Sequence, residues 1–126
     1  MNKGNKEGVS AGPGLIVKLA TNSEEEQGGE VVAVYVVVNV RVTDPVRYAE
    51  YRDKAPDTIA RYGGRYLARG GAVEVIEGEW DPQRLVLLEF ENMKRFREWY
   101  DSPEYTPLKR LRGEVTVTEL VVVEGL

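Results

Sequence analysis

The sequence predicts an α+β fold in which helices cover one face of a single antiparallel sheet. Two observations lead to this prediction. Valine recurs at every second position from Val34 to Val42, which is the pattern of a strand with one buried face. Helical segments, each opened by a capping residue, then alternate with further strands. The chain has 126 residues, 42 % of them hydrophobic, and this suits one domain with one core.

The first helix is marked at both ends. Asp44-Pro45 provides an N-cap and the residue best suited to the first helical position, and apolar residues follow at helical spacing up to Tyr62. Pro56 is expected to kink this helix because proline lacks the backbone N–H. Gly63-Gly64 ends it, so Arg65 to Arg69 is predicted to be the second strand.

The middle of the chain alternates between extended and helical patterns. Val73 to Trp80 is predicted to be a further extended segment, and Arg84 to Phe90 is the most clearly buried strand after the first. Asn92 can cap a helix that runs to Tyr100.

The last part supplies a short helix and a strand. Ser102-Pro103 caps the helix, Gly113 closes it, and Val115 to Val123 follows as the final strand. The order strand, helix, strand, strand, helix, strand is that of the ferredoxin-like fold, with both main helices on one face.

This plan leaves the second sheet face uncovered. Tyr35, Val37, Leu85 and Leu87 are predicted to lie on it, and soluble monomers rarely expose such an apolar surface. We therefore expect a homodimer in which two sheets pack face to face as an α+β barrel, with a cavity between them.

Composition excludes several functions. The chain has no cysteine and no histidine, so zinc-thiolate sites, thiol nucleophiles and histidine-ligated haem are absent from its repertoire. Its net charge of −4 makes it a poor partner for nucleic acid or anionic membranes. We expect a cytoplasmic protein without a metal or other cofactor.

The first thirty residues differ from the rest by their scattered glycines and their lack of aromatic residues. They are predicted to be a flexible extension, separate from the domain at 31–126. Two alternatives remain: an added edge strand at Leu15 to Ala20, or a start codon assigned too far upstream.

Several short motifs resemble one known family, the domain of unknown function 1330, over about Val34 to Gly125. The string from Trp99 to Tyr105 is the most specific of them. The others are Asp44-Pro45 with Tyr48 and Tyr51, Gly63-Gly64-Arg65-Tyr66-Leu67, Arg69-Gly70-Gly71, Glu77-Gly78-Glu79-Trp80, Glu89-Phe90, Leu111-Arg112 and Val123-Glu124-Gly125.

This resemblance implies the dimeric α+β barrel superfamily, which holds cofactor-free monooxygenases, lactone isomerases and haem enzymes. It implies no established reaction. Two features depart from the family pattern. The N-terminal extension has no counterpart, and the second helix carries Lys94 to Glu98 where the family is usually rich in alanine.

Strand alternation points to candidate catalytic residues. If the registers are regular, Asn39, Arg69 and Glu89 all lie on the sheet face away from the helices. Glu89 and Arg69 are then the candidate catalytic pair, a carboxylate that could move a proton beside a guanidinium that could orient an acidic substrate, and Asn39 is a candidate ligand-binding residue. The alternative is a salt bridge that satisfies two buried charges.

Four aromatic residues are further candidates for binding a planar ligand: Tyr48, Tyr51, Trp99 and Tyr105. At helical spacing such residues more often belong to the core, with Trp99 and Tyr105 as the exceptions because both flank the cap at Ser102. The leading hypothesis is thus a cofactor-independent enzyme, similar to a monooxygenase or an isomerase, acting on a small metabolite in a cavity between two sheets. The alternative is a binding or structural dimer without catalysis.

Overall fold

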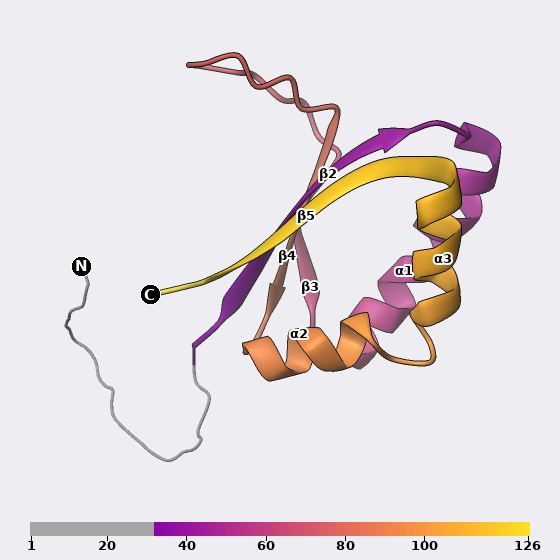
Figure 1. The fold of residues 1–126 in the computed structure, drawn as a ribbon. Helices are drawn as coiled ribbons and strands as arrows, with labels where there is room; N and C mark the ends of the chain where they lie inside the picture. Colours follow the sequence, from indigo (N-terminus) through magenta and orange to yellow (C-terminus); the bar gives the residue numbers. More distant parts are fainter. Residues whose placement is uncertain (1–31) are drawn as a thin grey trace. The chain divides into compact units, whose positions relative to one another are not determined.

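Four strands form one sheet, and the helices lie together on one of its faces (Figure 1). The computed structural model describes residues 32–126. The predicted N-terminal extension and its alternatives lie outside these residues. The elements in chain order are β2 (Val34–Val42), α1 (Pro45–Arg61), β3 (Arg65–Arg69), β4 (Arg84–Phe90), α2 (Met93–Tyr100), α3 (Thr106–Val115) and β5 (Thr116–Glu124).

The sheet has the order β3-β4-β2-β5, and every neighbouring pair is antiparallel. The predicted ferredoxin-like α+β fold is therefore confirmed. The register places Val38 opposite Val86 and Leu120, and these three side chains point toward the helices. We call this side the helical face and the other side the open face.

Hydrogen bonds confirm the predicted helix caps at Asp44 and Asn92. The Asp44 carboxylate accepts from the Arg47 N–H at 3.2 Å, and the Asn92 side chain accepts from the Arg95 N–H at 2.8 Å. Each of these two caps satisfies a backbone donor that the first turn of a helix leaves free. Ser102 Oγ accepts from the Tyr105 N–H at 3.1 Å, so it caps the turn before α3, and α3 itself begins at Thr106 without a side-chain cap.

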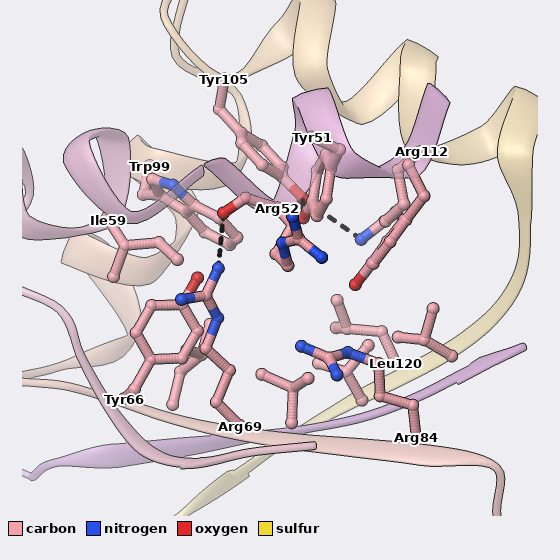
Figure 2. Close-up of a pocket in the computed structure, with 15 residues that line it drawn as sticks. Tyr51, Arg52, Ile59, Tyr66, Arg69, Arg84, Trp99, Tyr105, Arg112 and Leu120 are labelled. Carbon is pink, nitrogen blue, oxygen red and sulfur yellow. Dashed lines mark hydrogen bonds between the residues drawn. The ribbon is translucent and has the colours of Figure 1, made fainter. Parts of the chain in front are cut away.

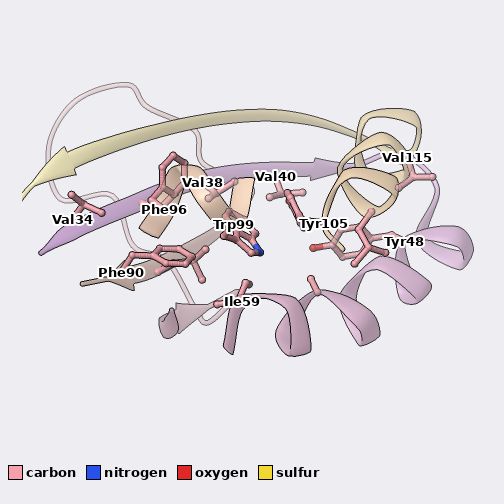
Figure 3. Close-up of a cluster of buried hydrophobic side chains, with 14 residues drawn as sticks. Val34, Val38, Val40, Tyr48, Ile59, Phe90, Phe96, Trp99, Tyr105 and Val115 are labelled. Carbon is pink, nitrogen blue, oxygen red and sulfur yellow. The ribbon is translucent and has the colours of Figure 1, made fainter. Parts of the chain in front are cut away.

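The core fills the space between the helical face and the helices (Figure 3). Val34, Val36, Val38 and Val40 are all buried, as the valine alternation predicts. An aromatic group from β4, α2 and the turn before α3 packs against them, and the Trp99 and Tyr105 ring centroids are 4.0 Å apart. The core therefore brings together residues that are far apart in the sequence.

Helix α1 contains Pro56, as predicted, and ends at Arg61. Helix α3 differs from the prediction at both ends, because it begins at Thr106 rather than at Ser102-Pro103 and continues through Gly113 to Val115. Tertiary packing outweighs the modest cost of a single glycine, since Leu108 and Val115 of α3 are both buried.

The connection between β3 and β4 projects away from the sheet (Figure 1). We call residues 71–81 the arm. All of them are exposed and none is assigned to a strand, so the extended segment predicted at Val73 to Trp80 adds nothing to the sheet. Ile76 and Trp80 are 80 % and 56 % exposed. The arm therefore presents apolar side chains that contribute little to the core.

Strand β3 contains a bulge that reverses its alternation. Tyr66 pairs with Leu88 and Ala68 pairs with Leu87, so Leu67 is an extra residue in the ladder. Arg69 then lies opposite Val86, on the helical face. The prediction that Arg69 points to the open face was therefore wrong, because it assumed a regular strand.

Candidate functional site

A small cavity lies between the helical face and the helices (Figure 2). Its volume is about 40 Å³, which is room for about three water molecules. Apolar side chains of β2, β4 and β5 form its floor, and α1 and α3 supply much of its roof. The predicted ligand-binding residues Tyr48, Tyr51, Trp99 and Tyr105 all line this cavity.

Four arginines line the cavity, and none of its lining residues is acidic. The arginines are Arg52, Arg69, Arg84 and Arg112. Figure 2 shows Arg84 reaching in from the sheet, while Arg52 and Arg112 reach in from the helical side. Since guanidinium groups stay protonated in proteins, this space is strongly positive inside a chain whose net charge is −4.

The two inner arginines lack partners at their Nε atoms. Arg84 Nε and Arg112 Nε are buried and form no hydrogen bond with any residue in the range 32–126. Within the same range, Arg69, Arg84 and Arg112 form no ion pair with a carboxylate. A buried donor without an acceptor is costly, so these groups need an explanation.

A pair of tyrosine hydroxyls meets beside Arg112. The Tyr51 and Tyr105 oxygens are 2.6 Å apart, and Arg112 Nη1 donates to the Tyr105 oxygen at 3.3 Å. Only one of the two hydroxyls can donate its hydrogen to the other oxygen. The hydrogen of the second hydroxyl is therefore available to another acceptor. The cavity therefore has a free O–H donor next to its guanidinium groups.

Burial disfavours ionisation of three tyrosines of the cavity, Tyr51, Tyr66 and Tyr105. It raises the pKa of Tyr51 well above its usual value, with a further contribution from Tyr105. It also raises the pKa of Tyr105, and it raises the pKa of Tyr66 to about 12. At neutral pH these hydroxyls are donors, and no lining side chain is a strong base.

Arg69 has a structural partner on α1. Proline at position 56 has no N–H, so the Arg52 carbonyl four residues earlier loses its helical hydrogen bond. Arg69 Nη2 donates to that carbonyl oxygen (Figure 2). The guanidinium also lies over the Tyr66 ring, 4.9 Å from its centroid. Arg69 thus compensates for Pro56 and ties β3 to α1 at the cavity mouth.

Gly70 leaves room for Arg84. Its φ is +69°, which few other residues adopt, and a Cβ there would lie 2.1 Å from Arg84 Nη1. Its N–H donates to the Leu85 carbonyl at 2.8 Å. Glycine at this turn therefore permits both the chain reversal and the guanidinium's position.

The predicted pairing of Glu89 with Arg69 does not form. Glu89 lies on the open face, where its carboxylate is 2.6 Å from Arg65 Nη2. Glu89 therefore has a salt bridge, as the alternative predicted, but with a different arginine. The bulge in β3 explains the exchange, because it turns Arg65 and Arg69 to opposite faces.

Asn39 is on the open face, as predicted. It accepts from the Gln83 N–H at 3.0 Å and donates to Glu119 at 3.3 Å. Asn39 and Glu89 are separated by four residues of strand, about 13 Å, because Tyr35 is the residue opposite Glu89. The three predicted polar residues therefore do not converge in the protomer.

Sequence reasoning missed Arg84 and Arg112, although signals for both were present. Arg84 is in phase with Val86 and Leu88, so simple alternation places it on the helical face. Arg112 lies four residues after Leu108 and three before Val115, on the buried side of α3. In both cases, an arginine at the spacing of the buried apolar residues indicated a charged side chain that points toward the core.

Comparison with known proteins places this domain in a family. A family model described as a domain of unknown function, DUF1330, matches residues 33–126. The chain belongs to the DUF1330 family. The resemblance predicted from the motifs is confirmed, and the match covers all of the elements described above. A search of the curated proteins found no significant match.

Several solved structures share the fold of this domain. A protein of unknown function from Rhodopseudomonas palustris is 17 % identical, with a TM-score of 0.64, over 76 % of this chain and 84 % of that one. SnoaB, a cofactor-independent oxygenase from Streptomyces nogalater, is 14 % identical, with a TM-score of 0.53, over 75 % and 94 % of the two chains. At these identities the likeness extends to the fold alone.

Two further observations concern ligands and membranes. Within residues 32–126, no group of three or more acidic side chains is placed to hold a metal ion. No helix in that range is long and apolar enough to cross a bilayer.

Proposed function

We propose that this protein is a homodimeric enzyme that acts on a small, enolisable metabolite without a bound metal or flavin. The proposed site is the cavity between the helical face and the helices, rather than a space between two sheets. One observation carries the proposal: guanidinium groups and protonated tyrosine hydroxyls converge in an apolar enclosure that has no carboxylate in its lining. The proposed location, the cytoplasm, rests on the sequence alone.

Such a set of donors suits negative charge that develops on a substrate oxygen. When a C–H bond beside a carbonyl loses its proton, the carbonyl oxygen becomes an enolate, and fixed donors in a dry site stabilise it. The cavity contains no strong base, so water or the substrate itself accepts the proton. Arg112 and the Tyr51–Tyr105 pair are the residues proposed to hold the enolate oxygen.

Two reactions could follow from an enolate. Return of the proton at another carbon gives an isomerisation. Reaction with O₂ converts a CH₂ group to a carbonyl and releases water, and all of the electrons come from the substrate. The fold shared with SnoaB motivates a test of the second reaction.

The dimer is proposed from the open face. Val117, Val121 and Val123 of β5 are 52 %, 62 % and 54 % exposed there, and the arm adds Ile76 and Trp80. A second copy packed on this face would cover these side chains. Glu89 and Asn39 would then lie near that interface, where they remain candidates for a role in the dimer.

The test uses acetylacetone as a neutral enolisable probe and acetoacetate as an anionic one. We expect the purified protein to accelerate exchange of their CH₂ hydrogens in D₂O, measured by NMR, while an oxygen electrode records any O₂ uptake. Arg112→Gln and Tyr51→Phe should each slow the exchange by about a hundredfold. Arg97→Gln, an exposed change on α2, is the matched control.

Equal exchange with and without the protein, together with no O₂ uptake, would refute the enzymatic proposal. If such a protein still bound small molecules in the cavity, the alternative of a non-catalytic binding dimer would be favoured. Loss of activity in Arg97→Gln to the same degree would mean that the charge of the surface, and not the cavity, matters.

A further inference from the structure

We infer that the physiological ligand of the cavity is a carboxylate on a planar, apolar body, held by Arg84 and Arg112. This inference rests on the proposed function, because it names the substrate class of the same site. It is carried by the two unpartnered Nε atoms and by the absence of any acidic lining residue.

The arginines are unexplained as structural groups. A buried guanidinium normally pairs with a carboxylate or with carbonyl oxygens, because removing its charge from water costs several kcal/mol. Arg69 has such a partner in the Arg52 carbonyl. Arg84 instead lies with its guanidinium carbon 5.9 Å from the centre of the Tyr48 ring, and Arg112 donates to the Tyr105 hydroxyl. Neither has a carboxylate partner in the range 32–126. Arginines that gather without a carboxylate partner in the range 32–126 are suited to bind an anionic ligand.

The geometry favours a carboxylate. The Nε and Nη atoms of one arginine form a planar fork that matches the two oxygens of a carboxylate. The free hydroxyl hydrogen of the Tyr51–Tyr105 pair offers an additional donor next to Arg112. A phosphate would also accept from arginine, but the cavity of about 40 Å³ offers few further polar groups for its other oxygens.

The walls favour a flat, apolar body behind the carboxylate. Tyr48, Tyr51, Trp99 and Tyr105 present ring surfaces, and the sheet side offers valine and leucine. Arg52 at the mouth is exposed, so its long side chain can move aside when a ligand larger than a few waters enters.

The test compares benzoate with benzamide, which have the same shape but differ in charge, and includes inorganic phosphate. Binding is followed through the rise in melting temperature and through the fluorescence of buried Trp99 in a Trp80→Phe background. Sodium chloride at the same ionic strength controls for screening. We expect benzoate to stabilise the protein and benzamide to have little effect.

The variants Arg84→Gln and Arg112→Gln should weaken benzoate binding by about tenfold or more, while Arg97→Gln leaves it unchanged. Without ligand, Arg84→Gln should melt at the same or a higher temperature, because it removes a guanidinium whose buried Nε has no acceptor in the range 32–126. A large drop in that melting temperature would identify Arg84 as a structural residue and overturn the inference.

The remaining outcomes separate the two proposals. Equal binding of benzoate and benzamide would overturn the carboxylate inference and leave the enzymatic proposal standing. Stronger stabilisation by phosphate would assign the site to a phosphate instead. No response to any of the three probes would count against both proposals.

Discussion

The Tyr66 hydroxyl lies in a half-buried position at the edge of the cavity, next to the guanidinium of Arg69. Its environment disfavours the charged phenolate, because burial withdraws it from water. The same physical effect keeps Tyr51 and Tyr105 protonated. At the scale of single residues, the cavity is therefore a set of donors whose protons stay in place at neutral pH.

This environment predicts a pH dependence at alkaline pH. The pKa of Tyr66 is about 12 in the folded protein, against about 10 in an unfolded chain. Because the folded state favours the protonated hydroxyl, Tyr66 contributes its full stabilisation below a pH of about 10. This contribution is lost as the pH rises through about 12. We expect the free energy of unfolding in urea to fall across this window, and to fall less steeply in Tyr66→Phe.

The difference in slope should be below about 1.4 kcal/mol per pH unit, since Tyr66 keeps some contact with solvent that reduces the effect. Identical slopes in the two proteins would contradict the raised pKa. A steeper slope in Tyr66→Phe would mean that the hydroxyl stabilises the folded state by ionising.

Strand β3 and helix α1 are connected through the gap that Pro56 leaves in the helical hydrogen bonds. The Arg52 carbonyl is free because of Pro56, and Arg69 reaches it only because the bulge in β3 turns the residue to the helical face. A proline on one element is thus matched by an irregularity on another. This connection also positions Arg52 and Arg69 at the cavity mouth.

A double-mutant cycle tests this connection between the elements. Arg69→Gln should destabilise the protein, and Pro56→Ala should restore an N–H to the Arg52 carbonyl. In the Pro56→Ala background, the loss from Arg69→Gln should therefore be smaller by about 1 kcal/mol in urea unfolding. Additive effects of the two changes would show that Arg69 does not compensate for Pro56.

Within residues 32–126, the open face is the side of the sheet that no helix covers. It combines exposed β5 valines with apolar residues of β2 and β4, and polar residues such as Asn39 and Glu89 lie among them. Solvent exposure of such a surface is unfavourable, and a second copy is the partner we propose to cover it.

Val121→Glu tests the proposed dimer. The residue is 62 % exposed in the protomer, so the fold should tolerate the change, but a buried carboxylate should weaken the dimer by about a hundredfold or more. Sedimentation at several concentrations measures the mass. Val46→Glu, at an 84 % exposed position of α1, is the control. An unchanged mass in both variants would exclude the open face as the interface.

Much of the fold could be predicted because its signals are local. The valine alternation of β2, the caps at Asp44 and Asn92, and the strand at Arg65–Arg69 all appear in the structure where the sequence placed them. The prediction was wrong for the ends of α3, which depend on tertiary packing. Helix α3 passes Gly113 because the buried residues on either side stabilise another turn.

The candidate site was predicted only in part. Its aromatic residues were correct as lining residues of a cavity, but the cavity lies on the helical face. The predicted Glu89–Arg69 pair does not form because Leu67 is an extra residue in β3. One extra residue moves every later side chain of a strand to the opposite face of the sheet. The local sequence pattern of β3 does not predict this bulge.

The sequence by itself determined the family, the order of the elements and the face of β2 that is buried, because periodicity and capping depend on neighbours along the chain. Only the tertiary structure decided which arginines meet. Arg52, Arg69, Arg84 and Arg112 come from four different elements, and their meeting depends on a bulge, a proline and a glycine turn. Such convergence depends on contacts between distant segments, which a linear pattern does not encode.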